Sequence, residues 1–229
     1  MTDDDLPDGG TPRLDRPWVV VVAGGSGSRF GAAKQFVEVA GRPVVAWSVA
    51  AARSLGGGVV LVVPAGREDD VPIGGADGSD VVVAGGASRS ESVRSGLAAV
   101  PAGVEVVVVH DAARPAASPA LFAAVVAAVD AGADAAVPGV DVVDSLRFRA
   151  GGTVDRDVLV AVQTPQAFRA PVLRAAHAAG GEASDDATLV EDAGGRVVVV
   201  PGEEANVKLT RPGDLDALAR ALGTAAVGA

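Results

Sequence analysis

The chain has 229 residues, of which 49% are apolar, so it is long enough to bury one full hydrophobic core. Its formal net charge of −10 argues against a nucleic-acid surface or an anionic membrane as its partner, and no apolar run approaches the roughly 20 residues of a membrane span. Cysteine is absent, which excludes disulfides and thiolate zinc sites.

The two ends of the chain are predicted to lie outside the folded part. Residues 1–16 are acidic and contain Pro and Gly, whereas a secretory signal would be basic and then apolar. We therefore expect 1–16 to be a disordered acidic tail of a cytoplasmic protein, 17–224 to be a single domain, and 225–229 to be a second tail.

The first strand leads into a loop with the character of an anion site. An unbroken apolar run, Trp18–Ala23, predicts a strand buried on both faces. The small residues Gly24–Ser28 follow, and their backbone N–H groups can come close to a ligand. Arg29 and Lys34 come next and indicate an anionic ligand, most simply a phosphate chain. The alternative is an ordinary Gly-rich turn with two solvated cations.

Two common phosphate loops do not match this stretch. A Walker A loop needs Gly-Lys-Ser/Thr, but Lys34 stands between Ala33 and Gln35. A dinucleotide fingerprint needs a third Gly three places after Gly27, and Phe30 is found there. The remaining pattern suits a nucleoside triphosphate held by backbone groups and basic side chains.

The next elements alternate between helix and strand. Apolar spacing predicts a helix over 43–55, a strand over 59–63 and an irregular polar crossover over 67–80. A strand over 81–84 leads into a second small-residue loop and a helix that Ser88 or Ser90 could cap. The predictions continue with a strand over 104–109, a helix capped by Ser118 over 119–131, and a strand over 135–140.

This alternation is typical of an α/β protein with a mostly parallel sheet and helices on both faces. Ligands of such sheets bind at the carboxyl ends of the strands. The Gly24 loop, the Gly85 loop and the segment His110–Pro115 all fall there, so we expect them to meet in one site.

The alternation breaks over 141–162. Polar and apolar residues alternate around Gly151-Gly152 and predict a β-hairpin of 144–149 against 153–160. We expect a projecting arm that packs on a second subunit, with a free surface hairpin as the alternative. Beyond the arm, the pattern predicts helices over 171–179 and 211–222, strands over 197–200 and 206–210, and a helix cap within 184–187.

Lysine usage is selective. The chain has 17 arginines and only two lysines, Lys34 and Lys208. A lysine ammonium is a compact point charge and does not replace the planar arginine fork at a phosphoryl group. Either these lysines have a specific task or two surface lysines have been kept by chance. Of the two histidines, His110 is expected to be a structural hydrogen-bonding residue and His177 to lie on a helix surface.

Six motifs occur in a recognisable order: AGGSGSRF, HDAARP, TVDR, TPQAF, SDDA and NVKLTRPGD. Over about Trp18–Leu222 the chain resembles the 2-C-methyl-D-erythritol 4-phosphate cytidylyltransferase family. Ribitol-5-phosphate cytidylyltransferase is the nearest alternative, and a non-catalytic nucleotide-binding module on the same fold is another.

The resemblance implies a Rossmann-like three-layer α/β/α nucleotidyltransferase domain with a mostly parallel sheet and a projecting β-arm. It also implies that CTP and a polyol phosphate, methylerythritol phosphate, give a cytidine diphosphate polyol and pyrophosphate, with Mg²⁺ or another divalent cation. The substrate phosphate would attack the α-phosphorus directly, so catalysis would be positioning plus electrostatic stabilisation. The resemblance further implies a homodimer formed through the arm.

Carried over by motif, the resemblance assigns roles to individual residues. Catalytic roles fall on Arg29, Lys34 and Lys208. CTP contacts fall on Ala23, Gly24, Gly25, Gly27, Gly85, Gly86, Ser92, Asp111 and Ala112, with Asp111 also the metal ligand. Substrate contacts fall on Arg156, Ser145, Thr164 and Ser184, and Arg156 would reach into the neighbouring subunit. Asp186 departs from the family pattern, because it replaces a Glu.

Overall fold

In the computed structural model, the residues described are 15–24, 34–71 and 78–225, without the side chains of 34, 224 and 225. The predicted tail over 1–14, most of the first loop (Gly25, Gly27 and Arg29 included) and 226–229 therefore lie outside the described residues. Asp15 and Arg16, at the end of the predicted tail, are exposed.

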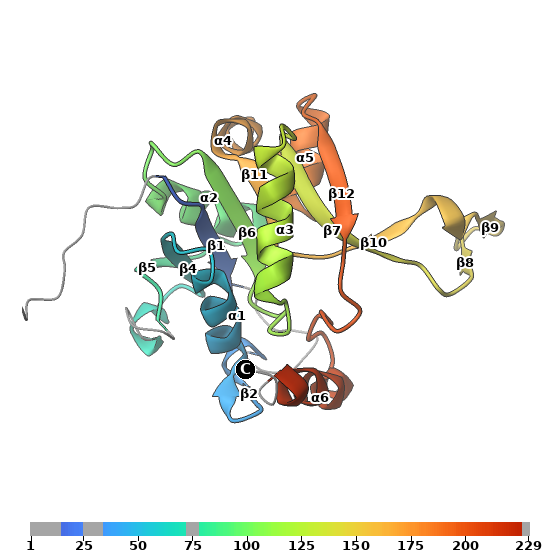
Figure 1. Ribbon diagram of the computed structural model, residues 1–229, viewed down its shortest axis with the longest axis horizontal. Helices are drawn as coiled ribbons and strands as arrows, with labels where there is room; N and C mark the ends of the chain where they lie inside the picture. Colours follow the sequence, from blue (N-terminus) through green and yellow to red (C-terminus); the bar gives the residue numbers. More distant parts are fainter. Residues whose placement is uncertain (1–14, 25–33, 72–77, 226–229) are drawn as a thin grey trace, which may run out of the picture.

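An eight-stranded sheet forms the centre of the molecule (Figure 1), with strands in the order β10-β7-β11-β6-β1-β4-β5 and β12 paired to β7. The pairs β1–β4, β1–β6, β4–β5 and β7–β12 are parallel, whereas β10 and β11 run antiparallel to their neighbours. The strands are β1 (Trp18–Val22), β4 (Val59–Val63), β5 (Val81–Ala84), β6 (Val106–Asp111), β7 (Ala135–Asp141), β10 (Val160–Val162), β11 (Gln166–Arg169) and β12 (Val197–Pro201).

Helices cover both faces of this sheet, which gives the predicted three layers (Figure 1). Alternate residues of β1 point to opposite faces, as the strand period requires: Trp18 and Val20 pack in one core, Val19 and Val21 in the other. The helices are α1 (Val44–Arg53), α2 (Arg89–Ala99), α3 (Pro119–Asp130), α4 (Ala170–Ala178), α5 (Asp186–Asp192) and α6 (Leu215–Ala225). α1 and α3 pack in one core, while α2, α4 and α5 pack in the other.

Side-chain caps fix where three helices begin. Ser88 Oγ accepts from the N–H of Glu91, so Ser88 and not Ser90 caps α2. Ser118 caps α3 as predicted. Within the predicted cap of α5, Asp185 is the capping residue and accepts from the N–H of Thr188.

A third, smaller core joins the end of the chain to the segment after the first loop. It is formed around Val39, Val44, Leu209, Leu218 and Leu222. The remaining short elements are β2 (Glu38–Val39), β3 (Arg42–Pro43), β8 (Leu146–Arg147), β9 (Thr153–Val154), η1 (Lys34–Phe36), η2 (Glu68–Asp70), η3 (Arg156–Val158) and η4 (Pro212–Asp214).

The hairpin arm is present and projects from the sheet (Figure 1), but its strands are shorter than predicted. Only β8 and β9, of two residues each, pair within the arm. The predicted second strand, 153–160, is interrupted by η3 and rejoins the main sheet as β10, which pairs with β7. Three apolar side chains in this region are strongly exposed, Val143, Phe148 and Val158.

Four other predictions were wrong in detail. β6 begins two residues late and continues through His110 and Asp111. β11 was missed, and 206–210 forms no strand, although Leu209 N–H donates to Ala113 O at 2.8 Å. His177 is buried, not exposed. Within the described part of the chain, none of the helices has the length and apolarity that crossing a membrane requires.

Candidate active site

The carboxyl ends of neighbouring strands lie side by side. Register pairs Val22 at the end of β1 with Asp111 at the end of β6 and with Val62 in β4, while Val63 of β4 pairs with Ala84 of β5. The two small-residue loops and the HDAARP segment therefore begin at the same edge of the sheet, where α/β proteins bind their ligands.

Gly24, the described start of the first small-residue loop, lies beside Gly85 of the second loop and beside Ser92 of α2. A Cβ built on Gly24 would lie 3.0 Å from Ser92 Oγ and 3.8 Å from the Cα of Gly85, and a Cβ on Gly85 would lie 2.8 Å from the same hydroxyl. A side chain at either glycine would therefore crowd the Ser92 hydroxyl. Ala23, just before, is buried, and its N–H donates to Val62 O at 2.7 Å.

Ser92 supports the second loop from beneath. Its hydroxyl donates to Ser88 O at 2.9 Å and accepts from the N–H of Gly86 at 3.2 Å, and the side chain is buried. A Cβ on Gly86 would lie 2.3 Å from Cβ of Glu91, whose carboxylate accepts from the N–H of Ala87 at 2.6 Å. The predicted base-reading segment is therefore held by α2, with its glycines closely packed.

A cluster of opposite charges forms at the end of β6. Lys208 Nζ donates to Asp111 Oδ2 at 2.5 Å, and Arg89 Nε donates to Asp111 Oδ1 at 3.3 Å. Asp111 comes from β6, Arg89 from the start of α2 and Lys208 from the segment before α6. The motifs placed both Lys208 and Asp111 in the predicted site but did not indicate Arg89, which is one of 17 arginines and begins α2.

These contacts set the charge state of the cluster. Burial alone would raise the pKa of Asp111, but the charges of Arg89 and Lys208 outweigh it and hold that pKa well below its usual value. Burial likewise lowers the pKa of Arg89, and Asp111 and Asp186 more than offset it, so the pKa of Arg89 is raised. Asp111 and Arg89 are therefore both ionised at neutral pH.

His110 and Thr164 orient the backbone of Asp111. His110 is fully buried, with Nε2 3.2 Å from Arg114 O and Nδ1 3.2 Å from Thr164 Oγ1. Thr164 Oγ1 in turn accepts from the N–H of Asp111 at 3.0 Å. Burial lowers the pKa of His110 to about 4 against the opposing charge of Asp111, so the ring is neutral and structural, as expected from the sequence.

Two residues predicted to contact a ligand, Thr164 and Ala112, make hydrogen bonds within the protein. Both hydrogen bonds of the Thr164 hydroxyl are internal and the side chain is buried, so in the structure it supports the backbone of Asp111, and the substrate contact expected from the motif stays a prediction. Ala112 is also buried; its N–H donates to Val22 O at 3.0 Å and its C=O accepts from Ser48 at 3.0 Å.

The segment that carries Lys208 is anchored by a buried amide. Asn206 Nδ2 donates to Thr164 O at 2.9 Å and to Gln163 Oε1 at 3.2 Å. Arg114 Nη1 donates to Asn206 O at 2.7 Å. Lys208, two residues further on, is thereby held above the end of β6, although 43% of its side chain is exposed.

The other predicted site residues lie elsewhere or outside the description. Arg156 and Ser145 are on the arm, where the guanidinium of Arg156 donates to Val143 O and lies 3.9 Å from Asp157. Ser184 is exposed just before the cap of α5. Lys34 begins η1, but its side chain, like Arg29, is not described.

The donors present fit a divalent cation that arrives with a nucleotide. Among the described residues, no group of three or more carboxylates, histidines or cysteines is placed to hold a metal. Asp111 is a single ionised carboxylate at a strand end, and Mg²⁺ commonly takes one or two carboxylates plus substrate phosphates.

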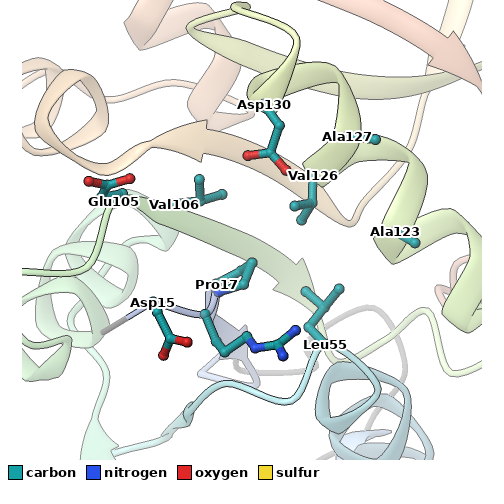
Figure 2. A pocket seen from close by; sticks show the side chains of 10 residues that line it. Asp15, Pro17, Leu55, Glu105, Val106, Ala123, Val126, Ala127 and Asp130 are labelled. Atoms are coloured by element: carbon teal, nitrogen blue, oxygen red, sulfur yellow. The ribbon is translucent and has the colours of Figure 1, made fainter. Parts of the chain in front are cut away.

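A hollow of about 350 Å³ lies at the opposite end of the strands (Figure 2). It is bordered by Pro17 before β1, by Glu105 and Val106 at the start of β6, and by Val126 and Asp130 of α3. The hollow shares no residue with the charged cluster around Asp111 at the carboxyl ends of the strands, and that cluster is the stronger candidate for the active site.

Such a fold, with ionised residues and small-residue loops gathered at one strand edge, is that of an α/β nucleotidyltransferase. The family model of 2-C-methyl-D-erythritol 4-phosphate cytidylyltransferase (IspD) matches residues 18–224, and the chain belongs to this family. This agrees with the resemblance seen in the motifs.

Individual relatives give the same result. The chain is 40% identical over 213 residues to a bifunctional enzyme IspD/IspF of Granulibacter bethesdensis, covering 89% of this chain and 55% of the relative. It is 43% identical over 224 residues to the bifunctional enzyme IspD/IspF of Clavibacter michiganensis, covering 91% of this chain and 55% of the relative. The chain thus spans about half the length of these curated relatives.

A solved structure of similar length also matches. The crystal structure of 2-C-methyl-D-erythritol 4-phosphate cytidylyltransferase from Thermus thermophilus has a TM-score of 0.77 and 38% identity, covering 91% of this chain and 98% of that chain. The bifunctional IspDF from Campylobacter jejuni matches with a TM-score of 0.78 and 26% identity, covering 88% and 54%.

Proposed function

We propose that this protein transfers a cytidylyl group from CTP to 2-C-methyl-D-erythritol 4-phosphate, which gives 4-diphosphocytidyl-2-C-methyl-D-erythritol and pyrophosphate for non-mevalonate isoprenoid biosynthesis. The observation that carries the proposal is the Lys208–Asp111–Arg89 cluster at the end of β6, beside the Gly24 and Gly85 loops, in a chain that belongs to the IspD family.

In this reaction a phosphate oxygen of the polyol phosphate attacks the α-phosphorus of CTP, and the bond to the bridging oxygen of the pyrophosphate breaks. The phosphate monoester needs no general base at neutral pH, which agrees with the neutral, buried state of His110. The task of the protein is to bring two polyanions together and to stabilise extra negative charge at the α-phosphoryl group.

Positive side chains would supply that stabilisation. Lys208 can turn from Asp111 towards the phosphates because its side chain is partly exposed. Arg29 and Lys34 are proposed to contact the α-phosphoryl group and the departing pyrophosphate. Asp111 would hold Mg²⁺, which when bound neutralises phosphate charge. The proposed CTP cradle consists of Ala23, Gly24, Gly25, Gly27, Gly85 and Gly86, with Ser92 and Ala112 supporting it from below.

The polyol phosphate would be bound in part by a second subunit. Val143, Phe148 and Val158, all within the arm, expose 78%, 62% and 77% of their surface, and three large apolar side chains exposed on one projecting element favour an interaction surface. This supports a homodimer in which Arg156, with Ser145, reaches the partner's site, while Ser184 contacts substrate within its own chain. The proposal includes a single domain over 17–224 and a cytoplasmic location, where CTP is made.

Pyrophosphate release tests this function. CTP should be used in preference to ATP, GTP and UTP, with methylerythritol phosphate as acceptor and Mg²⁺ present. A preference for ribitol 5-phosphate would assign the chain to the alternative polyol-phosphate cytidylyltransferase. Binding of CTP without turnover of either acceptor would indicate a non-catalytic nucleotide-binding module.

A further inference from the structure

Arg89 joins two carboxylates that come from different elements. Its Nε donates to Asp111 Oδ1 at 3.3 Å, and its Nη1 donates to Asp186 Oδ2 at 2.7 Å. Asp111 ends β6 and Asp186 begins α5, so the guanidinium ties the strand edge to the second helix after β11. Only 23% of the Arg89 side chain is exposed.

The far end of this bridge is a closed, buried anchor. Asp186 is fully buried, and its second oxygen, Oδ1, lies 3.0 Å from Nε2 of His177. A carboxylate only accepts hydrogen bonds, so Nε2 carries the proton and donates it. Each oxygen of Asp186 thus has its own donor, and neither is available to a ligand.

At the other end of the bridge, the two carboxylate oxygens of Asp111 have different partners. Asp111 Oδ1 faces the largely buried Arg89, whereas Oδ2 faces Lys208, whose side chain is 43% exposed. A partly exposed lysine on a flexible stem can exchange partners, but an arginine that also holds Asp186 cannot turn away without leaving Oδ2 of that buried carboxylate without a donor. One oxygen of Asp111 is therefore fixed and the other is exchangeable.

We propose that Arg89 is a positioning residue: anchored on Asp186 and His177, it holds the Asp111 carboxylate in place while Lys208 leaves Asp111 for the nucleotide phosphates. The inference rests on the proposed function, because it states which residue leaves Asp111 when the nucleotide binds and which residue stays. Arg89 need not touch either substrate to do this.

A conservative substitution tests the bridge. Arg89→Lys keeps the charge but loses the planar fork that spans two carboxylates. We expect kcat to fall by about 10- to 100-fold, the cost of a misplaced catalytic group, with the KM for CTP changed by less than about threefold. Arg174→Lys is the matched control, because Arg174 is held by the carbonyls of Leu97, Val100 and Pro101 in α2 and the turn after it.

The control separates positioning from stability. Both variants should lower the melting temperature, but Arg174→Lys should keep the kcat of the unmodified protein. If Arg89→Lys keeps kcat as well, or if the two variants lose kcat in proportion to their melting temperatures, the positioning role is overturned.

A second test measures CTP binding and needs no polyol phosphate. With only two lysines in the chain, ¹³C-lysine labelling gives two side-chain Cε signals, one of which is Lys208. CTP should shift the Lys208 signal in the unmodified protein. In Arg89→Gln, Lys208 is left as the cation paired with Asp111, so the same shift should need at least about tenfold more CTP, the cost of about one charge-assisted contact.

The outcomes are distinguishable. An equal response in Arg89→Gln and the unmodified protein overturns the inference and leaves the proposed function intact. No response of either lysine in the unmodified protein overturns both. If Arg89→Gln does not fold, the kinetic comparison of Arg89→Lys with Arg174→Lys still decides.

Discussion

The hydroxyl of Thr164 lies 3.2 Å from Nδ1 of His110, and it donates to that nitrogen because Nε2 must donate to Arg114 O. The same hydroxyl accepts from the N–H of Asp111. The Arg114 carbonyl thus sets the tautomer of His110, and the buried Thr164 hydroxyl satisfies the remaining ring nitrogen while it fixes the backbone of Asp111 at the end of β6.

Replacing this hydroxyl should affect stability and turnover more than substrate binding. Thr164→Val leaves a ring nitrogen and an N–H without partners, and we expect the free energy of unfolding to fall by about 2 kcal/mol. Thr164→Ser should restore most of it. We expect kcat to fall with little change in the KM for the polyol phosphate; a rise in that KM alone would instead support the substrate contact expected from the motif.

The buried neutral His110 predicts acid sensitivity. Its pKa is about 4 in the folded chain and near 6.5 when unfolded, so the unfolded chain binds the proton more readily. The contribution of His110 to the free energy of unfolding is therefore complete above pH 6.5. It is lost as the pH falls towards 4, and the total loss is about 3 kcal/mol. Asp111, whose folded pKa is also lowered, acts in the same direction at still lower pH.

Denaturant unfolding at several pH values measures this effect. His110→Gln removes the titrating ring and should flatten the profile between pH 6.5 and 4, whatever it does to stability at neutral pH. Parallel profiles for the variant and the unmodified chain over that range would contradict the assignment of a buried, neutral His110.

The sheet was largely predictable because its central strands are continuous apolar runs. Val59–Val63 and Val81–Ala84 have the predicted bounds, since turn residues delimit valine-rich segments that are buried or half-buried. β11 was missed because Gln166 looks polar, although only 1% of it is exposed. Its amide lies 3.4 Å from Gln163 O and 3.4 Å from Asp185 Oδ2, and the second partner is 19 residues away in sequence.

The site was predictable where a motif marks it and not where packing makes it. Lys208 stood out as one of two lysines, and it does meet Asp111. Arg89 and His177 carry no such mark, because their role comes from Asp186, which is 97 residues from Arg89 in sequence. A long-range ion pair of this kind has no local pattern that could reveal it.

Lys208 should matter for turnover far more than for folding. Its pair with Asp111 is partly exposed, and Arg89 still neutralises Asp111 when the lysine is absent. For Lys208→Ala we expect a loss of about 10²-fold or more in kcat, since a charge-assisted donor at a transition state is worth on the order of 3 kcal/mol, and a smaller loss of CTP affinity. Lys34→Ala should behave in the same way.

Arg67→Ala is a suitable control for Lys208→Ala. Arg67 pairs with Asp70 at a similar exposure of 45%, and neither residue belongs to the cluster around Asp111, although the Arg67 guanidinium also lies 4.7 Å from the Phe36 ring. Its loss should leave kcat unchanged and alter the free energy of unfolding by no more than about 1 kcal/mol, as for exposed pairs in general. Near-normal turnover of Lys208→Ala would remove that lysine from the proposed mechanism.

The arm gives the most direct test of a shared site. Arg156 begins η3, which ends at the exposed Val158, and lies between β9 and β10 on the arm that projects from the sheet (Figure 1). If it serves a partner's site, Arg156→Ala should chiefly raise the KM for the polyol phosphate, and Lys34→Ala should chiefly lower kcat. Each active site would then take Lys34 from one chain and Arg156 from its partner chain.

Mixing the two variants follows from this geometry. In a hybrid dimer, one site would combine an intact Lys34 with an intact Arg156 from the partner, so unfolding and refolding the variants together should recover roughly a quarter of the unmodified activity. That fraction follows because random pairing places half of the chains in hybrids, each with one restored site. The control is each variant refolded alone, which should recover almost nothing when the polyol phosphate is kept well below its KM. Activity of the mixture that equals the average of those controls would place Arg156 and Lys34 in the same chain's site.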